Sequence, residues 1–170
     1  SAQVRQLYES ACQRYRKVYV YVFSDHGMTK VTRRSDLLLR FKQLGLRYGR
    51  DYVAVWDSTM ARFWFEHEHA RAAVRDFLSA QTEGRIIDEA QLRAWGCDFP
   101  DHRFGELFFL LNPGTLFVPS FLNLGFVPGM HGYDPAHVDS RACWLTNHPT
   151  AKADRLVDIF PAMQAAAEAR

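Results

Sequence analysis

The chain has 170 residues, 48% of them hydrophobic and 24% charged, which predicts one globular domain with a sizeable buried core. Its net charge is only +2, since acidic and basic residues are nearly equal in number, and its basic clusters are short. We therefore expect no nucleic-acid partner. We find no signal peptide and no apolar run long enough for a membrane-spanning helix, so no membrane segment is expected.

The cysteines are three in number, widely spaced, and form no CxxC pair. Neither a thiolate zinc site nor a disulfide framework is therefore indicated. We expect free, partly buried thiols, which slightly favour a reducing, cytoplasmic compartment. These residues are Cys12, Cys97 and Cys143.

The N-terminal part of the sequence predicts a helix, a strand and a second helix. Apolar residues recur every three or four positions over residues 3–16, as in an amphipathic helix. The apolar run Val18–Phe23 is typical of a strand buried on both faces of a parallel sheet. A second helical pattern covers residues 35–46, with Gly45 as its C-cap. This order favours an α/β domain.

The rest of the sequence alternates short strand and helix patterns. Asp88 is a suitable N-cap for one of the helices. The turn Asn112-Pro113-Gly114 between two apolar runs predicts a β-hairpin. The expected strands are residues 52–56, 60–65, 85–87, 105–111, 115–118 and 143–146, and the expected helices are 68–79, 89–94 and 153–169.

Two outer segments, residues 1–34 and 127–170, have the pattern of a single α/β core built on part of a parallel sheet flanked by helices. Residues 35–126 have the pattern of an inserted α+β subdomain. A sheet that lacks its N-terminal strands exposes an unpaired edge, which favours dimerisation.

The strongest chemical signal is Ser24-Asp25-His26-Gly27, at the carboxyl end of the first predicted strand. Ligands of open α/β sheets bind at such strand ends. Asp25 and His26 offer an oxygen and an imidazole nitrogen, which together suit zinc or manganese. The alternative is that Asp25 caps a helix and His26 is a hydrogen-bonded core residue.

A second, weaker signal is the loop Met130-His131-Gly132-Tyr133-Asp134. The two loops together, with an apolar strand before the first, resemble the type I phosphodiesterase/nucleotide pyrophosphatase branch of the alkaline phosphatase superfamily. Related branches such as sulfatases share the Asp-His-Gly element but lack the His-Gly-Tyr-Asp context. Residues 143–147 and 156–161 also resemble the end of this family.

The resemblance implies that Asp25 and His26 are ligands of the metal ion that also holds the nucleophile, and that His131 is a ligand of its partner ion. It implies two divalent ions in the parent enzyme, zinc with manganese or magnesium as alternatives. It leaves open whether this chain alone binds either ion. The implied reaction is hydrolysis of a phosphoester or nucleotide small molecule, through attack by a Thr or Ser hydroxyl.

The family's nucleophile and its other metal ligands precede the Asp-His-Gly element, and the 24 residues before Asp25 match none of them. Two ions need about six or seven protein ligands, of which this chain would supply three. We therefore expect a C-terminal fragment without a catalytic residue of its own, inactive in isolation. The hydroxyls of Thr29, Thr59 and Ser120 are poor substitutes for the nucleophile.

Two other functions remain open: a non-catalytic metal-binding module, and a sulfatase-type or phosphonate-cleaving enzyme of the same superfamily. Among other residues, His67 and His69 could share a strand face as a metal pair, although a strand end running into a solvated helix is favoured. We interpret the remaining candidates as loop or surface histidines, an arginine packed on aromatic rings and subdomain core; they are His102, His137, His148, Arg62, Phe104, Phe108, Phe109, Phe117, Phe121 and Phe126.

Overall fold

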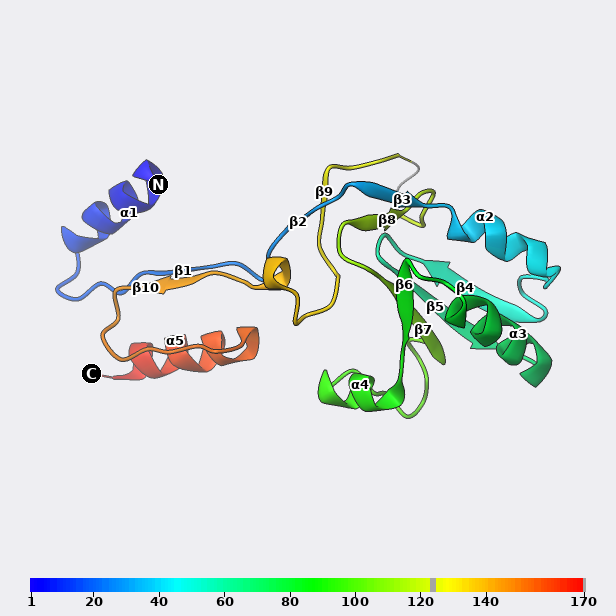
Figure 1. The fold of residues 1–170 in the computed structure, drawn as a ribbon. Helices are drawn as coiled ribbons and strands as arrows, with labels where there is room; N and C mark the ends of the chain where they lie inside the picture. The colour runs from blue at the N-terminus through cyan, green and yellow to red at the C-terminus, as the bar shows by residue number, and fades with distance from the viewer. Residues whose placement is uncertain (123–124, 170) are drawn as a thin grey trace. The chain divides into compact units, whose positions relative to one another are not determined.

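The structure is a computed structural model that describes residues 1–122 and 125–169. It is a mixed α and β chain that divides into two compact units (Figure 1). The first unit combines Ser1–Gly27 with Arg141–Arg170, and the second is Met28–Ser140. Within the described residues, no helix is both long and apolar enough to cross a membrane.

The first unit contains a two-stranded sheet and two α-helices. Strand β1 (Tyr21–Phe23) pairs antiparallel with β10 (Trp144–Thr146), which differs from the expected parallel, doubly buried strand. Phe23 is 46% exposed, so this strand is not buried on both faces. The helices of this unit are α1 (Ala2–Cys12), the 3₁₀ turn η3 (Leu156–Asp158) and α5 (Ile159–Glu168).

The second unit is built on a four-stranded antiparallel sheet with the order β4-β5-β7-β6. Its strands and helices are β4 (Tyr52–Trp56), β5 (Met60–Phe65), β6 (Gly84–Ile87), β7 (Leu107–Leu111), α2 (Leu37–Phe41), the 3₁₀ turn η1 (Lys42–Leu44), α3 (Glu68–Ser79) and α4 (Glu89–Ala94). Four of these, β4, β5, α3 and α4, have the bounds that the sequence predicts. Asp88 caps α4 as predicted, since its side chain accepts a hydrogen bond from the Gln91 N–H.

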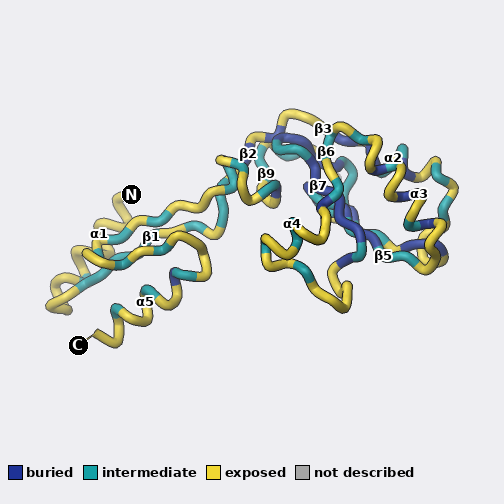
Figure 2. Tube along the Cα trace, turned by 60° about the horizontal axis from the view of Figure 1, so that its bottom comes forward, coloured by how far each residue is buried: buried dark blue, intermediate teal, exposed yellow. Residues whose placement is uncertain are grey.

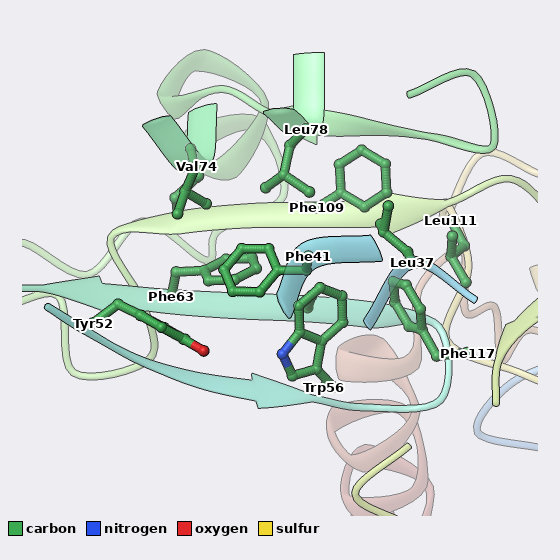
Figure 3. Close-up of a cluster of buried hydrophobic side chains, with 12 residues drawn as sticks. Leu37, Phe41, Tyr52, Trp56, Phe63, Val74, Leu78, Phe109, Leu111 and Phe117 are labelled. Carbon is green, nitrogen blue, oxygen red and sulfur yellow. The ribbon is translucent and has the colours of Figure 1, made fainter. Parts of the chain in front are cut away.

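The main core lies on one face of this sheet. Alternate residues of β5 and β7 point to this face, where the side chains of α2 and α3 cover them. Figure 3 shows Val74 and Leu78 pointing from α3 toward the strand that carries Phe109, with the side chains of Phe41 and Phe63 below that strand. The darkest stretches of Figure 2 follow β7 and β5, so this sheet is the most buried part of the chain.

The predicted hairpin around Asn112-Pro113-Gly114 is wrong. Strand β8 (Thr115–Phe117) leaves β7 and pairs in parallel with β3 (Arg33–Ser35). Gly114 turns the chain with φ +82°, and a Cβ there would lie 3.2 Å from the Lys30 carbonyl oxygen. The turn therefore leads the chain onto the segment around Lys30 instead of back along β7.

Three further short elements complete the second unit. Strand β2 (Thr29–Lys30) pairs antiparallel with β9 (Gly129–Met130), and η2 (Val138–Ser140) is a 3₁₀ turn. The cysteines are free, as expected, but all three are exposed and not partly buried. The aromatic core expected from six phenylalanines is also only partly present. Phe108, Phe109 and Phe117 are buried, whereas Phe104, Phe121 and Phe126 are exposed.

Candidate metal-ligand loops

The first candidate loop follows β1 directly. Ser24 forms two hydrogen bonds with Cys143, the residue directly before β10: its N–H donates to the Cys143 carbonyl (3.1 Å), and the Cys143 N–H donates to its Oγ (2.9 Å). Asp25 then accepts a hydrogen bond from the His26 N–H on Oδ1 (3.0 Å). The strand end and this short turn together fix the backbone of Asp25 and His26, and so the positions from which their side chains extend.

The His26 ring has a defined tautomer. Its Nδ1 lies 2.7 Å from the Gly27 carbonyl oxygen, which can only accept, so Nδ1 carries the proton of the neutral ring. Nε2 is then a lone-pair donor, the arrangement usual in metal-binding histidines. That nitrogen faces Asp25 Oδ2 at 3.4 Å.

The separation of these two atoms suits a shared cation. Two ligand atoms about 2.1 Å from a tetrahedral zinc ion lie roughly 3.4 Å apart. An unprotonated nitrogen and a carboxylate oxygen at this distance repel each other unless a proton or a cation lies between them. The oxygen and nitrogen of Asp25 and His26 therefore fit two coordination positions of one zinc ion.

The second candidate loop, Met130–Asp134, is anchored to the second unit at several points. Gly132 has φ +86°, and its carbonyl accepts a hydrogen bond from Thr59 Oγ1 (2.7 Å). The buried Tyr133 hydroxyl donates to the Thr115 carbonyl (2.8 Å), and burial raises the pKa of Tyr133. His131 is thereby followed directly by two residues that are hydrogen-bonded to buried threonines of the second unit.

Asp134 closes this loop through an ion pair. Its Oδ2 lies 2.6 Å from Arg85 Nη2, and its Oδ1 accepts from the Ala136 N–H at 2.9 Å. Partial burial raises the pKa of Asp134, but the hydrogen bond from Ala136 and the positive charge of Arg85 outweigh it and hold the pKa below its ordinary value. Asp134 thus serves to fasten the loop.

The two candidate loops adjoin paired strands. Thr29, which follows His26 by three residues, pairs with Met130, which directly precedes His131. Asp25 and His26 belong to the first unit and His131 to the second, and the convergence of both loops on neighbouring ions stays a prediction. Among the described residues, no group of three or more His, Cys, Asp or Glu side chains is close enough to hold a metal ion.

The other candidates have structural roles. The favoured interpretation of His67 and His69, a strand end running into a helix start, is confirmed: β5 ends at Phe65, His67 is the N-cap of α3 and His69 lies in its first turn. The alternative of a metal pair on one strand face is wrong, and the two rings stack with their centroids 5.4 Å apart. His137 Nδ1 accepts from the Asp139 N–H, and His148 Nδ1 accepts from the Ala151 N–H, so both are loop residues, as interpreted. His102 is exposed.

Of the hydroxyls considered as nucleophiles, Thr29 and Thr59 are buried, at 5% exposed each. Thr29 lies in β2, and Thr59 donates its hydroxyl to the second candidate loop. Ser120 is half-buried.

Comparison with models of protein families gives no match, and comparison with curated proteins gives none either. Solved structures do match. Human ectonucleotide pyrophosphatase/phosphodiesterase 5 superposes with a TM-score of 0.67 over 91% of this chain, at 20% sequence identity. The murine protein gives 0.66 over 85% of the chain at 21% identity, and its inactive variant in complex with AMP gives 0.66 over 85% at 20% identity.

This chain has the fold of part of a nucleotide pyrophosphatase/phosphodiesterase. It spans 40% of the human protein and 37% of the murine one. This fold agrees with the family resemblance of the two candidate loops. The structural likeness covers 91% of the chain and so includes most of its middle part, where the sequence shows no motif of the family.

Three residues that position the second loop in this nucleotide pyrophosphatase-like fold escape sequence reasoning: Thr59, Tyr133 and Arg85. Thr59 and Arg85 contact residues far away in the chain and stand in no motif, whereas Tyr133 belongs to the motif of the second candidate loop, which does not reveal its bond to Thr115. The only available signal was Tyr133 itself, an aromatic residue inside a glycine-bearing loop.

Proposed function

We propose that this chain is the C-terminal part of a two-metal phosphoester or phosphodiester hydrolase of the nucleotide pyrophosphatase type. The main support is the likeness of its fold to those enzymes over 91% of its length, together with the order of its two ligand loops. In the complete protein, β1 would join further strands upstream in a parallel sheet, and residues 35–126 would be an insertion between core segments.

In this proposal Asp25 and His26 bind one divalent ion and His131 binds its partner. The distance of 3.4 Å between Asp25 Oδ2 and His26 Nε2 supports the assignment of these two residues to one ion. The pairing of Thr29 with Met130, which precedes His131, supports the assignment of His131 to the partner ion. Zinc fits these oxygen and nitrogen donors best, with manganese and magnesium as alternatives.

The proposed ions would supply positive charge to the attacking and leaving oxygens of a phosphoryl group. The residues of this chain would position the ligands: Gly27 orients the His26 ring, and Thr59 and Tyr133 fix the part of the loop that directly follows His131. The nucleophile is expected upstream, so the isolated chain should show no turnover. The proposed substrate is a phosphoester or nucleotide, in keeping with the AMP complex of the murine relative's inactive variant.

The ligand assignment is tested by titrating the chain with zinc while the histidine ring signals are followed by NMR. We expect His26 to respond first, and the variants His26→Gln and Asp25→Asn to weaken zinc binding at least tenfold. His102→Gln removes an exposed histidine and is the matched control. If zinc shifts other histidines but leaves both His26 and His131 unchanged, the assignment is wrong.

The fragment hypothesis is tested by assaying the chain with zinc on p-nitrophenyl phosphate and on a p-nitrophenyl phosphodiester. No turnover is expected. Robust turnover that Asp25→Ala abolishes would mean that the chain carries its own nucleophile. The coding sequence upstream of Ser1 separates the remaining functions, because a Thr or Ser nucleophile there supports the hydrolase and a Cys-x-Pro-x-Arg motif supports a sulfatase.

A further inference from the structure

The four-stranded sheet of the second unit carries a cavity on the face opposite the main core. Its volume is about 380 Å³, within the range of roughly 300–1,000 Å³ that is usual for small-ligand sites. Residues of β5, β6 and β7 that alternate with core residues form its floor, and α4 and the loop after it form its walls. The apolar lining consists mainly of Met60, Ile87, Leu92, Trp95, Phe104 and Phe108.

Arg62 is the only charged residue that lines this cavity among the described residues. It lies in β5, directly opposite Phe108 of β7, in the middle of the apolar face. Its Nε is buried and has no hydrogen-bond partner among the described residues. A buried donor of a charged group without an acceptor is costly, so Arg62 is an incompletely satisfied cation within an apolar face.

The nearby carboxylates are each already paired with another arginine. Asp134 lies 2.6 Å from Arg85, and Asp101 lies 2.5 Å from Arg103. Glu106 is paired with Arg71. Among the described residues, no carboxylate forms an ion pair with Arg62.

We propose that this cavity binds a small amphipathic carboxylate, with its apolar body against the aromatic lining and its carboxylate on Arg62. A guanidinium matches a carboxylate in geometry and can bind it through two parallel hydrogen bonds. The apolar lining selects an alkyl or aryl body, and the single cation selects one negative charge. This site uses none of the proposed metal ligands, so it stands or falls independently of the hydrolase.

The cysteines provide a built-in test. Cys97 lines the cavity and is exposed, whereas Cys12 and Cys143 are exposed elsewhere. Alkylation of the full chain is followed by mass spectrometry at each cysteine, with and without decanoate. We expect decanoate to slow alkylation of Cys97 at least fivefold and to leave the other two rates unchanged. Equal protection of all three cysteines, or none, would overturn the proposal.

The charge requirement is tested with 1-decanol, which has the same alkyl chain and no charge. We expect decanoate to bind at least tenfold more tightly than decanol, the effect of a charge-assisted hydrogen bond. Arg62→Met should remove this preference and leave decanol binding unchanged, and Arg62→Lys, which keeps the charge and guards against misfolding, should retain part of it. An unchanged preference in Arg62→Met would contradict the role of Arg62.

Discussion

Gly132 occupies a position where a side chain meets two separate obstacles. Its φ of +86° is unfavourable for any residue with a Cβ, and that Cβ would lie 3.1 Å from Thr59 Oγ1. Gly96 shares the first obstacle, with φ +70°, but has no heavy atom within 4 Å of the same point. The two glycines therefore separate the backbone cost from the packing cost.

We predict that Gly96→Ala lowers the free energy of unfolding by about 1 kcal/mol and Gly132→Ala by about 2–3 kcal/mol. The additional loss at Gly132 comes from displacing Thr59, whose hydroxyl anchors the loop that carries His131. Urea denaturation followed by far-UV circular dichroism measures both values. Equal losses would show that the contact with Thr59 does not constrain the loop.

Asp134 links the same loop to the pH of the solution. Its folded pKa lies below its unfolded value, so its contribution to stability is present above the unfolded pKa and is lost as pH falls through the folded pKa. We predict that Asp134→Asn lowers the free energy of unfolding by about 0.5–1 kcal/mol at neutral pH, since the pair with Arg85 is partly exposed.

This difference between Asp134→Asn and the unchanged chain should shrink below about pH 4 and vanish once Asp134 is protonated in both states. Urea denaturation over a pH series checks it. Asp76→Asn is the control, because Asp76 lies exposed on α3 and its side chain forms no ion pair with any described residue. A difference that stays constant down to low pH would rule out the charge of Asp134 as its cause.

At the scale of elements, the two faces of β7 have different surroundings. Phe109 is fully buried between β7 and the helices of the main core, whereas Phe108 points to the opposite face, beside the cavity. Truncating Phe109 leaves a closed void, and truncating Phe108 only enlarges a cavity that is already there.

We therefore predict a loss of about 3–5 kcal/mol in the free energy of unfolding for Phe109→Ala and about 1–2 kcal/mol for Phe108→Ala. Urea denaturation measures both, and Phe109→Leu serves as a milder substitution if Phe109→Ala does not fold. Comparable losses at the two neighbouring positions would mean that the cavity beside Phe108 is filled.

The elements that the sequence predicts correctly are those whose pattern is local. The periodicity of residues 68–79 gives α3, and the apolar runs of residues 52–56 and 60–65 give β4 and β5 with their full bounds. Strands β2 and β3 are too short to show a period, and their partners lie about 80 to 100 residues away. Pairing between such distant short strands depends on tertiary packing, which a local pattern does not contain.

The candidate ligands Asp25, His26 and His131 could be proposed from the sequence because their neighbours form a motif. The groups that position the second loop could not be proposed in this way, because Thr59, Thr115 and Arg85 reach it through tertiary contacts that no motif marks. The strand pairing β2–β9, which places Thr29 opposite Met130, also emerges only in three dimensions.

At the scale of the whole molecule, the first unit leaves much apolar surface uncovered. Leu145 on β10 is 64% exposed, and β1 and β10 each have a single strand neighbour among the described residues. Unpaired strand edges beside exposed apolar side chains favour association with another chain. A dimer formed through this edge therefore remains our expectation.

We predict that the chain self-associates in a concentration-dependent manner and that Leu145→Lys weakens this association at least tenfold. Leu39→Lys is the matched control, because it adds the same charge at a leucine that is 53% exposed in the second unit. Sedimentation velocity over a range of concentrations measures the association. A chain that stays monomeric throughout, or equal effects of the two variants, would exclude this edge.

The four-stranded sheet also has a consequence for biosynthesis. All of its strands come from the continuous stretch between Tyr52 and Leu111, so a nascent chain can complete it before the later residues leave the ribosome. Strands β9 and β10 emerge afterwards and must find β2 and β1 across a long loop. The second candidate loop, which follows β9 and carries His131, is consequently assembled late, on a sheet that has already folded.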